Sequence, residues 1–261
     1  MTELVTFPVL KDNYAFLLHD HVSLRTAVVD VADHAPIIAE LEKHGWDLTD
    51  IWLTHHHWDH IDGLAPLLEA CAAKGWHPRV VAAKADMHRL PHTLITDQVE
   101  DGDTFMFGDI PVHIINVPGH TVGHIAYHVP SIATLFTADS LMALGCGRLF
   151  EGTPAQMWNS LQKLRALPPH TTVCSGHEYT ESNAAFAMSI DPENPALQAR
   201  VRDVKAARAA NMPTVPSQLQ LEMDTNPFLR ADNKDLKSAV GMANASDLDV
   251  FTEIRARKDR F

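Results

Sequence analysis

Cysteine is scarce in this 261-residue sequence, and long apolar runs are absent from it. The three cysteines, Cys71, Cys146 and Cys174, are odd in number and widely spaced, which argues against a disulfide framework and favours a reducing compartment. No apolar stretch approaches the roughly 20 residues that cross a bilayer, and residues 1–10 lack the pattern of a secretory signal. We therefore expect a cytoplasmic protein with no membrane partner.

Positive charge is also in short supply. Lys and Arg number 21 against 33 Asp and Glu, which gives a formal net charge of −12. A general nucleic-acid surface needs clustered Lys and Arg, so we expect no nucleic-acid partner. The charge does not exclude a small anionic substrate, because an acidic protein can still contain a local cationic pocket.

Histidine, by contrast, is concentrated in one run, Thr54–His60, which directly follows the apolar stretch Ile51–Leu53. That stretch is typical of a buried strand, in which alternate side chains point to one face. His55 and His57 can therefore bind one ion together, while the histidine between them points the other way. The last two residues of the run lie past the strand end, where a turn can direct both to a second ion. The pattern indicates a paired metal site.

Apolar periodicity divides the chain into two parts. Up to residue 174 the pattern is typical of a mixed α/β unit with helices on the outer faces of its sheets. We expect strands there over residues 14–19, 27–30, 51–53, 79–83, 104–107, 112–117, 125–129, 134–137 and 172–174, and helices over 35–44, 61–74 and 154–167. Later patterns are helical, over 182–190, 195–211, 236–243 and 247–258. The sequence predicts a catalytic domain at 1–174 and a helical domain at 175–261.

Further ligand-type residues stand where expected strands end. His120, Asp139 and His177 each follow such a strand by about four positions or fewer. Open sheets place ligand sites beyond the carboxyl ends of their strands. We therefore expect these residues to belong to the same metal site as the histidine run.

These motifs resemble the metallo-β-lactamase superfamily, and within it the glyoxalase II (hydroxyacylglutathione hydrolase) family. The resembling segments span nearly the whole chain: Thr54–His60, Pro118–His124, Thr137–Ser140, Gly145–Gly152, Gly176–Tyr179, Asn226–Arg230 and Arg255–Phe261. The histidine run identifies only the superfamily, whereas the Gly-Cys-Gly-Arg segment and the C-terminal Arg-x-x-Lys identify the family. The resemblance implies an α/β fold, a four-layer αββα sandwich (the metallo-β-lactamase fold) with a C-terminal helical domain.

The resemblance also implies two divalent metal ions. Seven ligands would hold them: His55, His57 and His120 on the first ion, Asp59, His60 and His177 on the second, and Asp139 bridging the two. We expect Zn²⁺, although imidazole and carboxylate ligands also suit Fe and Mn. His56 is expected to pack or to support the site from behind. His124 and Asp30 are candidates for supporting hydrogen bonds, with a purely structural role as the alternative.

The reaction that the resemblance implies is hydrolysis of S-2-hydroxyacylglutathione thioesters, such as S-lactoylglutathione, to a 2-hydroxy acid and glutathione, the second step of methylglyoxal detoxification. A hydroxide held by the two metals would attack the carbonyl carbon. Asp59 would be the catalytic carboxylate, which orients this hydroxide or takes its proton. The thiol product has a pKa of about 8.5 and leaves readily as the anion.

Glutathione carries two carboxylates, so its pocket should offer cations. By resemblance, Arg148, Arg255 and Lys258 bind these carboxylates, and Tyr179 forms a hydrogen bond nearby. Phe150 stands where some relatives carry a tyrosine that contacts the substrate, so that hydroxyl contact is missing. The alternative for the C-terminal cations is an ordinary basic helix end, favoured by the helix dipole.

Two other functions fit part of the pattern. A glutathione persulfide dioxygenase would use one iron and leave His60 and His177 idle. A non-catalytic metal-binding protein of the same fold would bind metal without thioesterase activity. A β-lactamase or lactonase fits less well, because neither explains the cationic C-terminal segment. We expect a monomer that acts on a small glutathione thioester.

Overall fold

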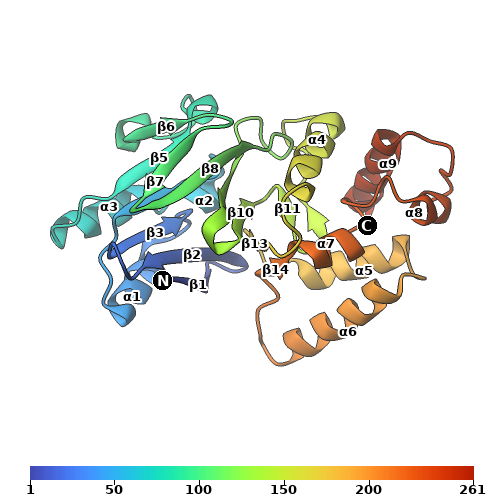
Figure 1. Ribbon diagram of the computed structural model, residues 1–261, viewed down its shortest axis with the longest axis horizontal. Helices are drawn as coiled ribbons and strands as arrows, with labels where there is room; N and C mark the ends of the chain where they lie inside the picture. Colours follow the sequence, from blue (N-terminus) through green and yellow to red (C-terminus); the bar gives the residue numbers. More distant parts are fainter. The chain divides into compact units, whose positions relative to one another are not determined.

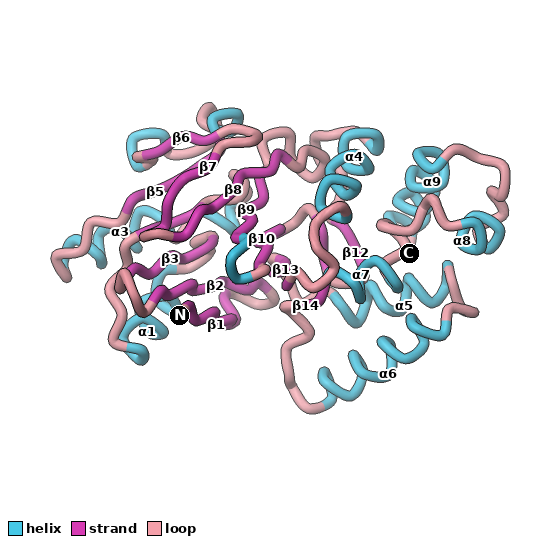
Figure 2. Tube along the Cα trace, viewed as in Figure 1, coloured by secondary structure: helices cyan, strands magenta, loops and turns pink.

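The computed structural model describes every residue from Met1 to Phe261 and divides into two compact units. Unit 1 comprises Met1–Asn116 and Val122–Phe136, and unit 2 comprises Val117–Thr121 and Thr137–Phe261. Figures 1 and 2 show the path of the chain and its helices and strands. No helix is both long and apolar enough to span a membrane.

Unit 1 contains a six-stranded mixed sheet with the strand order β1-β2-β3-β4-β5-β6. The strands are β1 (Thr2–Val9), β2 (Asn13–Asp20), β3 (Arg25–Val29), β4 (Asp50–Trp52), β5 (Arg79–Ala83) and β6 (Asp97–Val99). The first three pair antiparallel, and β3 to β6 run parallel. Parallel neighbours need crossover connections. These connections contain α1 (His34–His44), α2 (Trp58–Ile61), α3 (Leu64–Ala73) and the 3₁₀ helices η1 (Lys84–Asp86) and η2 (His92–Leu94).

Helices α1 and α3 bury their apolar faces against this sheet. Ile37 and Leu41 of α1 and Leu64 and Leu67 of α3 are fully buried, in one cluster with apolar side chains of the strands. Burying each such side chain contributes about 1.5–3 kcal/mol. The packing of α1 and α3 therefore stabilises the sheet, and the histidine run follows strand β4 of this sheet.

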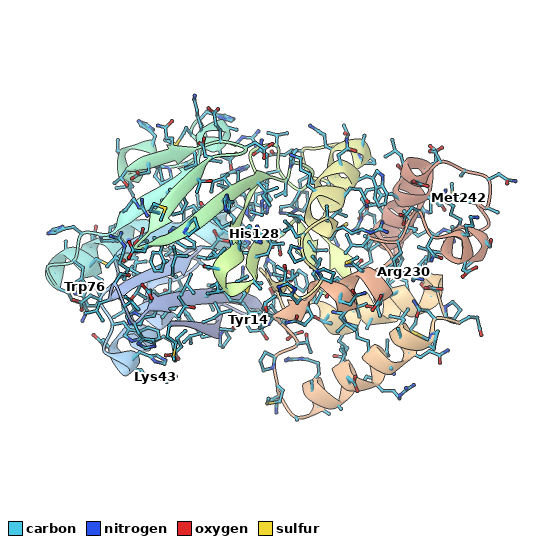
Figure 3. The ribbon with its side chains drawn as sticks, in the orientation of Figure 1. Tyr14, Lys43, Trp76, His128, Arg230 and Met242 are labelled. Carbon is cyan, nitrogen blue, oxygen red and sulfur yellow. The ribbon has the colours of Figure 1, made fainter.

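The other strands of unit 1 form an antiparallel meander. They are β7 (Thr104–Phe107), β8 (Ile110–Asn116), β9 (Ile125–Val129) and β10 (Thr134–Ala138), with the 3₁₀ helix η3 (Pro130–Ile132) before β10. The fully buried ring of Trp52 in β4 lies 5.4 Å from that of Phe107 and 5.5 Å from that of Tyr127. The two sheets thus pack face to face. Figure 3 places the buried ring of His128 within this unit and Lys43 at its surface.

Unit 2 is mostly helical. It contains β11 (Leu141–Met142), β12 (Gly145–Cys146), α4 (Pro154–Arg165), β13 (Thr172–Ser175), α5 (Thr180–Ile190), α6 (Pro195–Ala209), β14 (Ser217–Gln218), α7 (Leu219–Thr225), α8 (Lys234–Ala239) and α9 (Asp247–Arg260). Helices α5 and α6 lie side by side (Figure 1) and share an apolar cluster that includes Ala187 and Leu197. Phe228 contacts the rings of Phe186 and Phe251, which joins α5 to α9.

Most of the expected elements are confirmed. The structure also contains strands and a helix that the sequence patterns do not predict, namely β1, β6, β11, β12, β14 and α7. The helix expected over 61–74 begins later, as α3 at Leu64, and residue 61 instead ends the short helix α2. The break between these helices contains Gly63, where a Cβ atom would lie 2.9 Å from the backbone of Asp33. A residue with a side chain would therefore not fit between α2 and α3 at this position.

Candidate metal centre

The histidine run lies where β4 leaves the sheet of unit 1. Residues 53–57 follow β4 without regular secondary structure, and His57, whose backbone is extended, is the N-cap of α2. The ring centres of His55 and His57 are 4.7 Å apart, and those of His55 and His60 are 4.3 Å apart. Asp59 Oδ2 lies 3.8 Å from His60 Nε2. The four expected ligands in unit 1 therefore gather in one place.

Asp30 fixes the orientation of two of these rings. Its Oδ2 lies 2.8 Å from His60 Nδ1 and also accepts a 2.8 Å hydrogen bond from the Thr54 hydroxyl. That hydroxyl lies 3.0 Å from His55 Nδ1. Since the Thr54 proton is used on Asp30, His55 Nδ1 must donate, and His60 Nδ1 donates to the carboxylate. Both rings thus carry their lone pairs on Nε2, the tautomer that binds metal there. Asp30, a candidate for a supporting hydrogen bond, makes such a bond to His60.

Asp59 is held by a residue that the sequence patterns do not single out. Asn13, at the start of β2, donates from Nδ2 to both Oδ2 and the backbone carbonyl of Asp59, each over 3.1 Å. Asn13 is buried, and the amide is a donor matched to a carboxylate. Its neighbourhood reads only as a turn in the sequence, so no local signal identifies it.

The other histidines of these motifs surround the cluster. His124 is fully buried, and its ring stacks on that of His55 with centres 4.6 Å apart and an interplanar angle of 10°. Its Nδ1 lies 3.0 Å from the Ile125 carbonyl oxygen. His56 Nδ1 lies 3.0 Å from Asp86 Oδ2, and its ring centre is 5.1 Å from that of His57. His124 therefore packs on the expected ligand His55, and His56 contacts both Asp86 and the expected ligand His57.

Unit 2 brings together the three remaining expected ligands. His120 Nε2 and His177 Nε2 lie 3.4 Å and 3.3 Å from Asp139 Oδ2. His120 Nδ1 lies 2.8 Å from the Arg148 carbonyl oxygen, which can only accept. In the neutral ring, Nε2 then presents a lone pair to a carboxylate oxygen. His120 Nε2 and Asp139 Oδ2 are then two acceptors that face each other without a proton between them. A cation bound by both atoms would remove the repulsion between them.

Backbone contacts inside unit 2 set this geometry. The Gly176 N–H donates to the Ala138 carbonyl over 3.0 Å, which places the segments before Asp139 and His177 next to each other. Ala138 has a φ of 40°, a left-handed conformation that is unfavourable for alanine. At Gly147 a Cβ atom would lie 2.0 Å from the Asp139 carbonyl oxygen and 2.9 Å from His120 Nδ1. Only glycine fits there.

The donor set in both units suits a transition metal. Imidazole nitrogens and carboxylate oxygens bind Zn²⁺, Fe and Mn. His55 and His60, with Asp30, also offer ligand atoms that all lie within 4.8 Å of one another. The residues present therefore fit metal ions, while the identity of the metal is not fixed by them.

The residues expected to bind substrate all lie in unit 2. The Tyr179 ring stacks on His177 with centres 4.6 Å apart and an interplanar angle of 6°. The Phe150 ring lies 5.3 Å from that of His120 and is 63% exposed. Each aromatic ring therefore contacts a histidine that is expected to bind metal.

Arg255 and Lys258 lie on α9. Arg255 is buried and donates to the Cys146 carbonyl over 3.0 Å and to Asp259 Oδ1 over 2.9 Å. Lys258 donates to the Ser182 carbonyl over 3.2 Å. Burial, followed by the positive charges of Arg255 and Arg148, lowers the pKa of Lys258 from 10.5 to about 8. The two cationic side chains of α9 are suited to binding an anion. Arg255, however, already donates hydrogen bonds to two protein groups.

Family models cover the chain almost from end to end. The metallo-beta-lactamase superfamily matches residues 16–177, and the hydroxyacylglutathione hydrolase C-terminus matches residues 178–261. The hydroxyacylglutathione hydrolase of Ruegeria pomeroyi is 57% identical over 99% of both chains, and that of Maricaulis maris is 48% identical over 100% of both. The chain belongs to the hydroxyacylglutathione hydrolase family. This membership confirms the expected metallo-β-lactamase fold with its helical C-terminal region, and it identifies a metal-dependent hydrolase.

Solved structures agree on the fold. ETHE1 from Myxococcus xanthus has a TM-score of 0.65 at 21% identity and covers 98% of this chain and 90% of its own. The B3 metallo-beta-lactamase BLEG-1 has a TM-score of 0.63 at 21% identity, over 88% of this chain and 99% of its own. The protein TTHA1623, solved in a di-iron-bound form, has a TM-score of 0.61 at 25% identity, over 87% and 100%.

Proposed function

We propose that this hydroxyacylglutathione hydrolase cleaves S-2-hydroxyacylglutathione thioesters, such as S-lactoylglutathione, to a 2-hydroxy acid and glutathione with two divalent metal ions. Zn²⁺ is our first choice, with Fe and Mn as alternatives. The observation that carries the proposal is the fixed tautomer of His55, His60 and His120, because hydrogen bonds on Nδ1 leave Nε2 to bind metal. The di-iron-bound form of TTHA1623 supports a pair of ions.

The proposed ligands are those that family resemblance implies: His55, His57 and His120 for one ion, Asp59, His60 and His177 for the other, and Asp139 for both. Divalent ions, when bound, supply positive charge that lowers the pKa of water to about 7 and polarises a carbonyl. Asp59 would orient the attacking water or accept its proton, with its carboxylate held in place by Asn13.

No cysteine serves as the nucleophile in this proposal. Cys71, Cys146 and Cys174 are all buried, and burial raises the pKa of each thiol, to about 11 for Cys71. A thiol is a strong nucleophile only as the thiolate. Departure of glutathione needs no strong protein acid, since its thiol has a pKa of about 8.5.

The substrate would be held from unit 2. Arg148, Arg255 and Lys258 would bind the glutathione carboxylates, with Tyr179 donating a hydrogen bond and Phe150 contributing apolar contact. The family match to the hydroxyacylglutathione hydrolase C-terminus supports this assignment. We propose a catalytic domain at 1–174 and a helical substrate-binding domain at 175–261, in a monomer.

One purified sample tests the function. Hydrolysis of S-lactoylglutathione and metal content are measured together, for the wild type and for His57→Ala. We expect about two ions per chain, equal release of thiol and acid, and loss of turnover in the variant. Full activity with one iron and uptake of oxygen would favour the persulfide dioxygenase alternative. Metal-loaded protein without thioesterase activity would favour a non-catalytic role.

A further inference from the structure

A fully buried carboxylate, Asp86, lies behind the histidine run. It ends η1, directly after β5, and its side chain has no exposure to solvent. Its Oδ2 lies 3.0 Å from His56 Nδ1, and its Oδ1 has no hydrogen-bond partner. Burial of a carboxylate with one oxygen unsatisfied is destabilising. Its presence is therefore not explained by the stability of the fold alone.

The hydrogen bond from His56 to Asp86 has a defined direction. Arg89 Nη1 lies 3.4 Å from His56 Nε2, and a guanidinium can only donate. His56 therefore accepts on Nε2 and donates from Nδ1 to Asp86. This fixes the ring between two charged side chains. It also fixes the backbone between His55 and His57, because side chains alternate across an extended segment.

Asp86 also touches the second ligand-bearing motif. A Cβ atom on Gly123 would lie 2.3 Å from Asp86 Oδ1 and 2.5 Å from its Cγ. The carboxyl group thus rests against the backbone of the segment that carries His120 three residues earlier. One buried side chain contacts two of the motifs that supply metal ligands.

We propose that Asp86 is a positioning residue for the metal site: by holding His56 it sets the backbone that directs His55 and His57 to one ion. The inference rests on the proposed function, since it concerns the affinity of that site for metal. Asp86 itself binds neither metal nor substrate. Residues that orient metal ligands typically contribute about 10–100-fold to affinity.

The test measures Zn²⁺ affinity of metal-free protein by competition with a chromophoric chelator, together with the unfolding temperature of each metal-free variant. His56→Ala and Asp86→Ala should each weaken Zn²⁺ binding about 10–100-fold. Asp86→Asn keeps an oxygen that can accept from His56 and should stay within about threefold of wild type. Because Asp86 acts through His56, the double alanine variant should bind no more weakly than the weaker single variant.

Asp50 supplies a matched control. It is equally buried, lies on β4 and pairs with Arg25 and Arg79. Asp50→Asn should lower the unfolding temperature without changing Zn²⁺ affinity. Equal loss of affinity in this control, or unchanged affinity in His56→Ala, would overturn the inference, and the His56 variant decides even where an Asp86 variant does not fold. Absence of metal binding in the wild type would instead refute the proposed function.

Discussion

Lys258 should be a residue whose charge destabilises the fold but helps to bind substrate. Its pKa falls from 10.5 to about 8, so the folded state disfavours the ammonium form. At about 1.36 kcal/mol per pKa unit this corresponds to about 3 kcal/mol, which we halve to about 1.5 kcal/mol because water still reaches the half-buried amine. Lys258→Met removes the charge, and with it the contacts of the ammonium group over the rings of Phe186 and Phe261, whose loss offsets part of the gain. It should therefore stabilise the protein at pH 7 by less than about 1.5 kcal/mol.

The pH dependence follows from the direction of this pKa change. Below pH 8, Lys258 is charged in both the folded and the unfolded state, and the full destabilisation is present. Between pH 8 and 10.5 the folded state loses its proton first, so the unfolded state binds more protons and stability rises with pH. The stability difference between the wild type and Lys258→Met should therefore shrink across this range. Urea unfolding at a series of pH values measures it.

Substrate binding should show the opposite trend. If Lys258 binds a glutathione carboxylate as a cation, KM should rise about fivefold between pH 8 and pH 9, as the amine with a pKa of about 8 loses its proton. Lys258→Arg keeps its charge at these pH values, so its KM should stay flat. The same rise in KM for wild type and Lys258→Arg would refute the reasoning. So would a destabilised Lys258→Met protein.

Three further substitutions test the site. Asn13→Ala removes both donors to Asp59 and should cost about 1–3 kcal/mol and lower kcat more than KM; lower stability at unchanged kcat would contradict the proposed role. Gly147→Ala places a methyl group 2.0 Å from the Asp139 carbonyl oxygen and should reduce metal content, measured on purified protein. Arg255→Ala should raise KM for the glutathione thioester and change the rate less for a thioester without glutathione carboxylates; an unchanged KM would exclude Arg255 from the pocket.

The clustering of the histidine run could be predicted from sequence, because the spacing of its residues determines which side chains lie together. A two-residue period places His55 and His57 on one side of a strand extension, and the structure gathers them with His60. The positions of Asp139 and His177 just after strands likewise predict that they lie close together. The segments before them are hydrogen-bonded neighbours in the structure. Helix α1 likewise begins after the cap Asp33 and ends at Gly45, as such residues predict.

The supporting residues could not be predicted, because their role depends on contacts between distant segments. Asn13 is 46 residues from Asp59, and Asp86 is 30 residues from His56. Neither lies in a pattern that differs from an ordinary turn or helix end. The burial of Arg255 against Cys146, 109 residues away, is of the same kind. The periodicity of a sequence predicts which face of a helix or strand a residue occupies. It does not predict which residue of a distant segment will be its hydrogen-bond partner, because this depends on tertiary packing.

The burial of every sulfhydryl has a consequence for an enzyme that releases glutathione. Under oxidising stress the surrounding pool contains oxidised glutathione, which forms mixed disulfides only with accessible, ionised sulfur. Cys71, Cys146 and Cys174 are enclosed, so the folded chain offers no point of attack. The catalyst should thus keep its mass and its turnover in oxidised glutathione, and glutathionylation of the native protein would show this expectation to be wrong.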